Sequence, residues 1–209
     1  MRRLFSIALL LWATSLSFGC NSDSGTTQIM GPGAVPADLR TLVDVTTGLD
    51  ITSGETGTFN FAGQSFVVPE SGAFGDLRFN FYTFQKTPVA FGNLYLLSQE
   101  YLGLPGALSS VTPGFVARSE SIAEGVYVFN TSAVITGGTK YWVYTDGQGS
   151  FAGSFDTDIY TGGDLYVTGI ASAPFRKAQA SGRMVGGVFV PAPAGVFVDA
   201  NFRLQARSR

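Results

Sequence analysis

Apolar and polar side chains alternate along most of the chain after residue 40 with a period of two, the period of a β-strand with one buried face. The alternation is clearest over residues 75–84 and 196–206. In the first segment the apolar face carries Leu77, Phe79, Phe81 and Thr83. In the second it carries Val196, Val198, Ala200, Phe202, Leu204 and Ala206. Both segments are therefore predicted to be half-buried strands with a polar outer face.

Shorter segments with strand character follow one another between turn signals such as Pro105-Gly106 and Gly137-Gly138. They span residues 41–46, 57–61, 64–68, 91–98, 114–119, 125–130, 140–145, 156–160, 164–169 and 184–190. Many short strands at this spacing are typical of an antiparallel sandwich. The pattern predicts one all-β domain over residues 38–209, an antiparallel and jelly-roll-like β-sandwich.

The polar faces of the two clearest strands are the candidate binding surface. They carry Arg78, Asn80, Tyr82, Asn201, Arg203 and Gln205. Glycan recognition uses this mixture, because an aromatic ring covers the apolar face of a sugar while amide and guanidinium groups bind its hydroxyls. If both strands belong to one sheet, the side chains form a single polar platform. The alternative is an ordinary solvated face without a ligand.

The first 19 residues have the features of an export signal. Arg2 and Arg3 precede the apolar run 4–12, which is too short to span a bilayer because spanning takes about 20 residues. Residues 20–37 have turn-forming composition and almost no apolar pattern, so they are predicted to be a flexible tether. The expected organisation is a signal peptide (1–19), a tether (20–37) and the sandwich domain (38–209).

The end of the signal, Leu16-Ser17-Phe18-Gly19-Cys20, resembles the lipobox of bacterial lipoproteins. Gly19 and Cys20 match that pattern, whereas Ser17 and Phe18 depart from it. The resemblance implies cleavage before Cys20, lipidation of its sulfur and acylation of its amine. It also implies the bacterial outer membrane, because the following residue is not the aspartate associated with inner-membrane retention. Since Cys20 is the only cysteine, the chain has no intramolecular disulfide.

Composition narrows the possible functions. Without Arg2 and Arg3 the chain keeps 11 basic against 15 acidic side chains, a net charge of −4 that argues against nucleic acid as a partner. Histidine is absent, which excludes a Ser-His-Asp triad and histidine metal sites. The glutamates lie mostly beside turn residues, with no spacing that places two across a cleft. The chain is therefore not expected to be an enzyme, and no cofactor is expected.

Three aspartates near glycines, Asp146, Asp156 and Asp158, offer one possible metal site. Calcium binds several oxygen ligands, and aspartate-rich loops supply them. Turn chemistry explains the same residues, because aspartate side chains bond to nearby backbone groups in turns. A structural calcium ion therefore stands as an alternative beside the plain turn.

Five short motifs occur in an order that resembles the bacterial choice-of-anchor β-sandwich domains, over about residues 55–206. They are Gly63-Gln64-Ser65-Phe66, Leu102-Gly103-Leu104-Pro105-Gly106-Ala107-Leu108, Gly125-Val126-Tyr127-Val128-Phe129, Thr139-Lys140-Tyr141-Trp142-Val143 and Asp199-Ala200-Asn201-Phe202-Arg203-Leu204. The resemblance implies a jelly-roll-like sandwich on an exported, surface-attached protein. It implies no catalytic residues.

These observations lead to one main hypothesis and two alternatives. The main hypothesis is a lipid-anchored, non-catalytic protein of the bacterial envelope that serves binding or adhesion, with a glycan as ligand. The first alternative is a structural or assembly lipoprotein with an envelope protein as partner. The second is a hydrolase of surface polymers, which requires two carboxyl groups facing each other in a cleft.

Overall fold

The computed structural model describes residues 38–46, 53–154 and 157–209. All the described strands belong to one compact unit, Pro32–Arg209. The predicted signal peptide, tether and lipid attachment site Cys20 lie outside the described residues, as does Asp156. None of the helices in the described part of the chain has the length and apolar character needed to span a bilayer.

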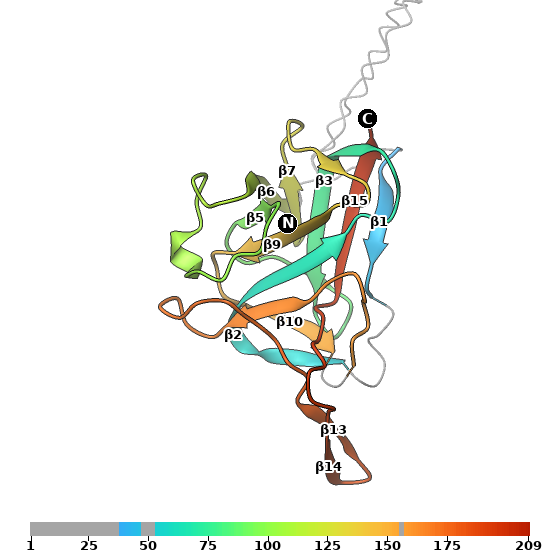
Figure 1. The fold of residues 1–209 in the computed structure, drawn as a ribbon, viewed down its shortest axis with the longest axis vertical. Helices are drawn as coiled ribbons and strands as arrows, with labels where there is room; N and C mark the ends of the chain where they lie inside the picture. The colour runs from blue at the N-terminus through green and yellow to red at the C-terminus, as the bar shows by residue number, and fades with distance from the viewer. Residues whose placement is uncertain (1–37, 47–52, 155–156) are drawn as a thin grey trace, which may run out of the picture. The chain divides into compact units, whose positions relative to one another are not determined.

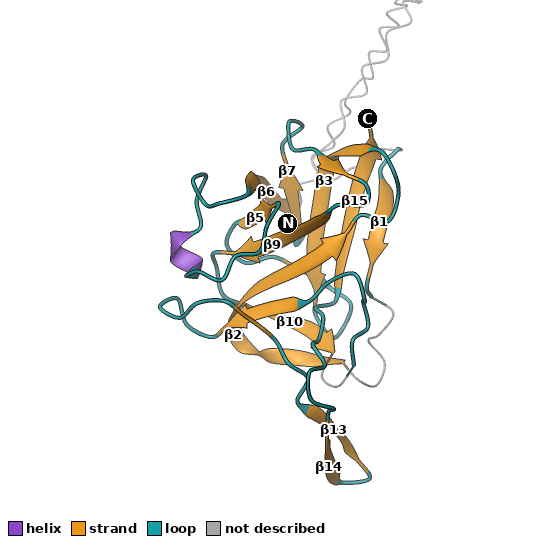
Figure 2. Ribbon diagram, in the orientation of Figure 1, coloured by secondary structure: helices purple, strands orange, loops and turns teal. Residues whose placement is uncertain are grey.

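The domain is an all-β antiparallel sandwich, as the alternation predicts (Figure 2). Its larger strands are β1 (Arg40–Asp44), β2 (Ser53–Val67), β3 (Ala73–Tyr82), β5 (Leu94–Leu97), β6 (Phe115–Ala123), β7 (Val126–Phe129), β9 (Lys140–Thr145), β10 (Gly149–Ser154), β11 (Leu165–Thr168) and β15 (Phe202–Ser208). The shorter elements are β4 (Pro88–Val89), β8 (Ile135–Thr136), β12 (Arg176–Lys177), the hairpin strands β13 (Gly182–Val185) and β14 (Val188–Pro191), and the 3-10 turn η1 (Pro105–Ala107).

The strands form one hydrogen-bonded path in the order β1-β15-β3-β7-β6-β5-β9-β2-β11-β12 (Figure 1). Strand β6 joins the two layers, because its first half pairs with β5 and its second half with β7. One layer therefore contains β1, β15, β3 and β7, and the other contains β5, β9, β2 and β11. The β13–β14 hairpin pairs only with itself and extends away from the sandwich.

Aromatic side chains fill the space between the layers. Phe79 of β3 stacks on Phe202 of β15 with ring centroids 5.3 Å apart, and Phe66 of the opposite layer lies 6.2 Å from Phe79. All three side chains are fully buried. Burying a phenylalanine stabilises the fold by about 1.5–3 kcal/mol. The apolar faces predicted for 75–84 and 196–206 thus lie in the core, except for Thr83 and Val196, which are partly exposed.

Two predicted boundaries differ because glycine has a different role at each. Segments 57–61 and 64–68 are one strand, β2, because Gly63 stays in the ladder, paired with Tyr144 on one side and Tyr166 on the other. A Cβ at Gly63 would overlap the Tyr144 ring, so this glycine permits a close approach and does not form a turn. Segment 184–190 is a hairpin instead of one strand, with both Gly186 and Gly187 in the left-handed region at its turn.

The segment 196–206 also differs from the prediction, because only its second half belongs to β15. Residues before Phe202 pair with β10: Ser154 N–H donates to Asp199 O at 2.9 Å, and Asn201 N–H donates to Ala152 O at 2.9 Å. Asn201 O then accepts from Tyr82 N–H at 2.9 Å, so the chain changes partner strand at Asn201. Strand β10 was not predicted, and residues 157–160, predicted as part of a strand, form none.

Candidate functional site

The two strands that carry the predicted binding residues lie side by side in one sheet (Figure 1). Asn80 is opposite Arg203, and Arg78 is opposite Gln205. Since Phe79, Phe81, Phe202 and Leu204 point into the core, the intervening positions lie on the outer side. The structure therefore brings together the six predicted residues, here called the polar face: Arg78, Asn80, Tyr82, Asn201, Arg203 and Gln205.

One end of the polar face is closed by its own interactions. Arg203 donates to Asp44 Oδ2 of the edge strand from Nε at 3.0 Å and contacts the same oxygen from Nη2 at 2.8 Å. Its guanidinium carbon also lies 5.5 Å from the centre of the Tyr82 ring. Tyr82 is only 6% exposed, so its ring is covered and cannot receive a sugar. We call Asn80, Tyr82, Asn201 and Arg203 the closed end.

Two asparagines at the closed end are buried without satisfying their hydrogen bonds. Asn201 is fully buried, and among the described residues neither its Nδ2 nor its Oδ1 has a hydrogen-bond partner. Asn80 is 3% exposed, and its Nδ2 has no partner there either. A buried polar group without a partner costs about 1–3 kcal/mol. These side chains were predicted to face solvent, and for both the prediction is wrong. Asn201 lies where the chain exchanges β10 for β3 as its hydrogen-bond partner.

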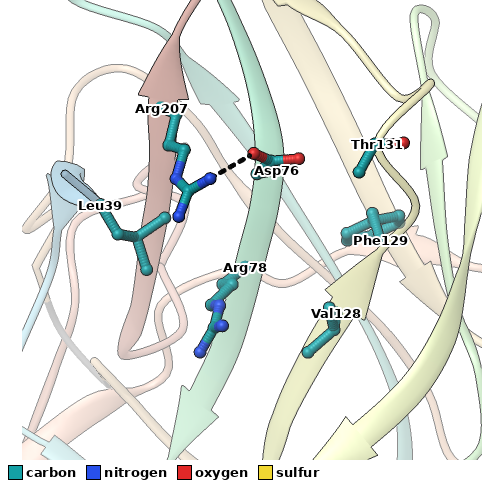
Figure 3. Close-up of a pocket in the computed structure, with 7 residues that line it drawn as sticks. All are labelled: Leu39, Asp76, Arg78, Val128, Phe129, Thr131 and Arg207. Atoms are coloured by element: carbon teal, nitrogen blue, oxygen red, sulfur yellow. Dashed lines mark hydrogen bonds and ion pairs between the residues drawn. The ribbon is translucent and has the colours of Figure 1, made fainter. Parts of the chain in front are cut away.

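The other end of the polar face is open. Here a cavity of about 230 Å³ lies over β3, β7 and β15, and Figure 3 shows its lining. We call it the Arg78 pocket; its lining residues are Leu39, Asp76, Arg78, Val128, Phe129, Thr131 and Arg207. Drug-sized ligands occupy pockets of about 300–1,000 Å³. The Arg78 pocket is smaller and suits a single sugar ring or an end group.

Two arginines at or beside the Arg78 pocket, Arg207 and Arg209, contact carboxylates, whereas Arg78 contacts none among the described residues. Arg207 contacts Asp76 Oδ2 at 3.2 Å and Asp38 Oδ1 at 2.7 Å, and Arg209 contacts Asp76 Oδ1 at 3.8 Å. Figure 3 shows the Arg207–Asp76 contact, with the Arg78 guanidinium pointing away from it. Within the described part of the chain, the half-buried Arg78 guanidinium has no hydrogen-bond or ion-pair partner. It is therefore available to an anionic or strongly accepting ligand group.

Some residues of the Arg78 pocket were missed by sequence reasoning. The alternation of Arg203 and Gln205 continues to Arg207, one position beyond the predicted segment, so that signal was present in the sequence. Asp76 belonged to the predicted strand but was not singled out; its φ of 51° lies in the left-handed region. Leu39 lies just before β1 and Thr131 just after β7, and nothing in the sequence places them at this pocket.

The aspartates of the predicted calcium site have separate surroundings. Asp146 accepts hydrogen bonds from Asn93 N–H at 2.6 Å, from Asn93 Nδ2 at 2.8 Å and from the Tyr95 hydroxyl at 3.2 Å. Asp158 accepts from Tyr160 N–H at 3.1 Å. Over residues 38–46, 53–154 and 157–209 there is no group of three or more histidine, cysteine, aspartate or glutamate side chains suited to a metal ion. The third predicted ligand, Asp156, lies outside the described residues, so the calcium site stays a prediction.

A buried carboxyl group, that of Asp199, lies at the corner of the sandwich, where the chain passes from β10 to β3 as its hydrogen-bond partner. It accepts from Gln64 Nε2 at 3.0 Å and from Tyr160 N–H at 3.0 Å, and the same Tyr160 N–H also donates to Asp158. Burial, and then the neighbouring Asp158 carboxylate, raise the pKa of Asp199 to about 7, although the bonds from Gln64 and Tyr160 oppose the shift.

The Gln64 side chain also links the two motifs that contain Gln64 and Asp199, because Gln64 Oε1 accepts from Ala200 N–H at 2.9 Å. Both motifs are thus part of the framework that fixes the start of β15. This corner positions the polar face but contributes no side chain to the Arg78 pocket.

Comparisons with protein-family models, with curated proteins and with solved structures found no match to this chain.

Proposed function

We propose that this protein is a lipid-anchored, non-catalytic component of the bacterial envelope that binds a glycan through the open end of its polar face. One observation carries the proposal: in the Arg78 pocket, a guanidinium with no hydrogen-bond or ion-pair partner among the described residues lies beside apolar surface on hydrogen-bonded strands. Sugars present hydroxyl groups on their edges and C–H groups on their faces. A site with a multiple donor beside an apolar wall matches both parts of such a ligand.

The neighbouring side chains extend the same chemistry. Gln205 lies opposite Arg78 on β15, and its amide contacts Thr41 of β1 at 3.5 Å. Val128 pairs with Arg78 from β7 and borders the pocket. The three strands are hydrogen-bonded together, so the donors and the apolar surface keep fixed positions before a ligand arrives. Fixed positions reduce the entropy lost on binding.

The non-catalytic part of the proposal rests on the carboxyl groups. Among the residues that line the Arg78 pocket, Asp76 is the one carboxylate, and Arg207 holds it in an ion pair. Glycoside hydrolysis needs two carboxyl groups flanking the scissile bond. The pocket is therefore suited to binding rather than to cleavage.

The attachment to the envelope is proposed from Cys20 and its surroundings. A signal of 19 residues, an acylated cysteine and a tether up to residue 37 would hold the domain at the outer membrane. More than one acyl chain on one residue gives stable attachment, whereas a single chain gives marginal binding. Replacing Cys20 with Ser should release the protein from membranes and abolish labelling with radioactive palmitate. Retention of Cys20→Ser in the membrane fraction would contradict the anchor.

A second candidate function is that of a structural or assembly lipoprotein that associates with another envelope protein. The β13–β14 hairpin favours it, because four large apolar side chains there are exposed: Val185, Val188, Phe189 and Val190 at 49%, 66%, 56% and 45%. Exposed apolar patches commonly mark sites of protein association. In this case the glycan would be absent, and the hairpin would be the functional surface.

A binding screen separates the two candidates. The full-length protein in detergent is titrated against immobilised bacterial and plant glycans, with and without calcium. The proposal predicts saturable binding to one glycan class, weakened by Gln205→Ala beside the Arg78 pocket and unchanged by Gln99→Ala, an exposed glutamine after β5. Absence of binding to any glycan would refute the proposal and favour the assembly role.

A further inference from the structure

We propose that the Arg78 pocket binds a carboxylate group, so that the glycan ligand is an acidic polysaccharide containing uronate residues. This inference rests on the proposed function, because it names the class of glycan that the open end accepts. It depends on three features of the pocket: the free guanidinium, the local balance of charge and the position of the apolar wall.

The Arg78 guanidinium is half-buried and has no partner in the described residues, whereas Arg203, on the same face, is neutralised by Asp44. A partly buried charge without a counter-ion is unfavourable, and a ligand that supplies one is favoured. The planar fork of arginine matches the two oxygens of a carboxylate with parallel hydrogen bonds. A neutral sugar hydroxyl has a single oxygen, so it cannot match the fork with two parallel bonds, and it brings no charge.

The side-chain charges indicate a group with a single negative charge. Arg207 and Arg209 are offset by their contacts with Asp38 and Asp76, which leaves the Arg78 guanidinium as the side-chain charge of the pocket without a counter-charge among the described residues. A carboxylate neutralises this charge fully. A phosphate monoester carries about 1.5–2 negative charges at neutral pH and would leave an excess beside Asp76.

Asp76 is prevented from neutralising Arg78 by its own partners. Both of its carboxylate oxygens face other arginines, Oδ2 toward Arg207 at 3.2 Å and Oδ1 toward Arg209 at 3.8 Å. Figure 3 shows Asp76 and Arg78 on the same strand, with the carboxylate directed to Arg207 and the guanidinium directed away. This arrangement keeps Arg78 free although an acidic residue lies two positions away in the chain.

The apolar lining explains why the carboxylate belongs to a sugar. Leu39 borders one side of the pocket and Val128 with Phe129 borders the other (Figure 3). A uronate residue places a carboxylate at one end of a ring whose face is made of C–H groups. The cavity of about 230 Å³ accommodates one such ring, with Arg78 on the carboxylate and the apolar side chains along the ring.

The test is a titration of the full-length protein in detergent with three polymers: polygalacturonate, its methyl ester and dextran sulfate. The inference predicts binding to polygalacturonate at least tenfold tighter than to the neutral ester, and no preference for the sulfate. Arg78→Gln should weaken binding to polygalacturonate at least tenfold. Arg176→Gln, the same charge change on β12 outside the pocket, should leave the affinity unchanged.

A second variant keeps the test informative if Arg78→Gln alters the fold. Asp76→Asn removes the negative charge from the lining, and asparagine tolerates the left-handed φ of 51° at this position. It should tighten binding to polygalacturonate several-fold, an effect in the opposite direction to structural damage.

Three outcomes would overturn the inference, and they separate it from the proposed function. Equal binding to polygalacturonate and its methyl ester, or normal binding by Arg78→Gln, would leave a glycan-binding protein without a carboxylate site. Stronger binding to dextran sulfate would show a general anion site. If no polymer binds, the proposed function fails. Sodium glucuronate is then titrated into the protein while the NMR resonance of the Arg78 Nε–Hε group is followed. An unchanged resonance would also overturn the inference that the Arg78 pocket binds a carboxylate.

Discussion

The two ends of the polar face come from the same alternation in the same pair of strands, yet one is closed and the other is open. At the closed end Arg203 is paired with Asp44 and covers the Tyr82 ring, and two asparagines are buried beneath the surface. At the open end Arg78 is unpartnered in the described residues and faces a cavity. The comparison shows that the partners supplied by neighbouring strands, and not the alternation itself, decide which polar side chains are available.

The edge strand β1 accounts for part of this difference. It places Asp44 opposite Arg203 but Thr41 opposite Gln205. A carboxylate next to an arginine neutralises it, whereas a threonine beside a glutamine adds only a weak contact. Strand β1 therefore supplies a counter-charge to Arg203 at the closed end and a neutral side chain next to Gln205 toward the open end.

The largest expected effect comes from breaking the core that supports both ends. Phe79→Ala removes a ring that stacks on Phe202 and contacts Phe66 and Phe81, so the free energy of unfolding should fall by about 3–5 kcal/mol. Both ends should fail together, with loss of glycan binding as the fold is lost. Denaturant unfolding measures the change, and Phe84→Ala, a 45% exposed ring, is the control with little effect.

A change of pH should separate the stability of the fold from binding without any mutation. The raised pKa of Asp199 means that the folded protein holds this proton more tightly than the unfolded chain does. Its stabilising contribution is present below about pH 4 and is lost as the pH rises toward 7, by roughly 2–4 kcal/mol. Binding to the Arg78 pocket should stay constant over the same pH range while the protein is folded, because Asp199 does not line the pocket.

Asp158→Asn is the matched variant for the pH effect, because it removes the carboxylate that opposes ionisation of Asp199. Thermal unfolding of this variant should depend less on pH than that of the natural protein. An identical pH profile for both proteins would show that Asp199 does not control this dependence.

The unsatisfied asparagine at the closed end gives a prediction of the opposite sign. Asn201→Leu removes two buried polar atoms without partners and keeps a similar shape, so the free energy of unfolding should rise by about 1–2 kcal/mol. Asn130→Leu is the contrasting variant, because Asn130 Oδ1 accepts hydrogen bonds from Ser132 and Ala133. Chemical denaturation of both should show a gain for the first and a loss for the second; a loss for Asn201→Leu would mean that its polar atoms are satisfied.

The smallest expected effect is that of Arg203→Gln on stability. The Arg203–Asp44 pair is about one-third exposed, so solvent screens it, and the cation–π contact with Tyr82 adds a comparable amount. The loss should be about 1 kcal/mol in thermal unfolding at low salt and smaller at high salt. A loss that is equal at both salt concentrations would be inconsistent with an ionic contribution.

The sequence predicts much of this architecture, for reasons that are local. The alternation in 75–84 identifies β3, its buried face and the outward position of Arg78. It fails at Asn201, because the exchange of hydrogen-bond partners there depends on β10, a strand with two glycines that carries no clear period. The Tyr82 ring is covered by Arg203 of the neighbouring strand, and the alternation alone does not reveal that these two strands are neighbours.

The candidate site was predicted in part. Arg78 and Gln205 were identified from the sequence, and the pairing of their strands followed only from the structure. Arg207 was within reach of the same alternation, whereas Leu39 and Thr131 are brought to the pocket by tertiary packing. The lipid site Cys20 and the calcium hypothesis for Asp146, Asp156 and Asp158 stay predictions.

The most direct test of the difference between the two ends is a parallel titration of Arg78→Gln and Arg203→Gln with polygalacturonate, together with their thermal unfolding. The two variants lose the same charge from the same face. The account predicts that Arg78→Gln loses binding at least tenfold and unfolds like the natural protein, while Arg203→Gln unfolds at lower temperature and binds within twofold of it. Loss of binding in Arg203→Gln with normal binding in Arg78→Gln would contradict the account.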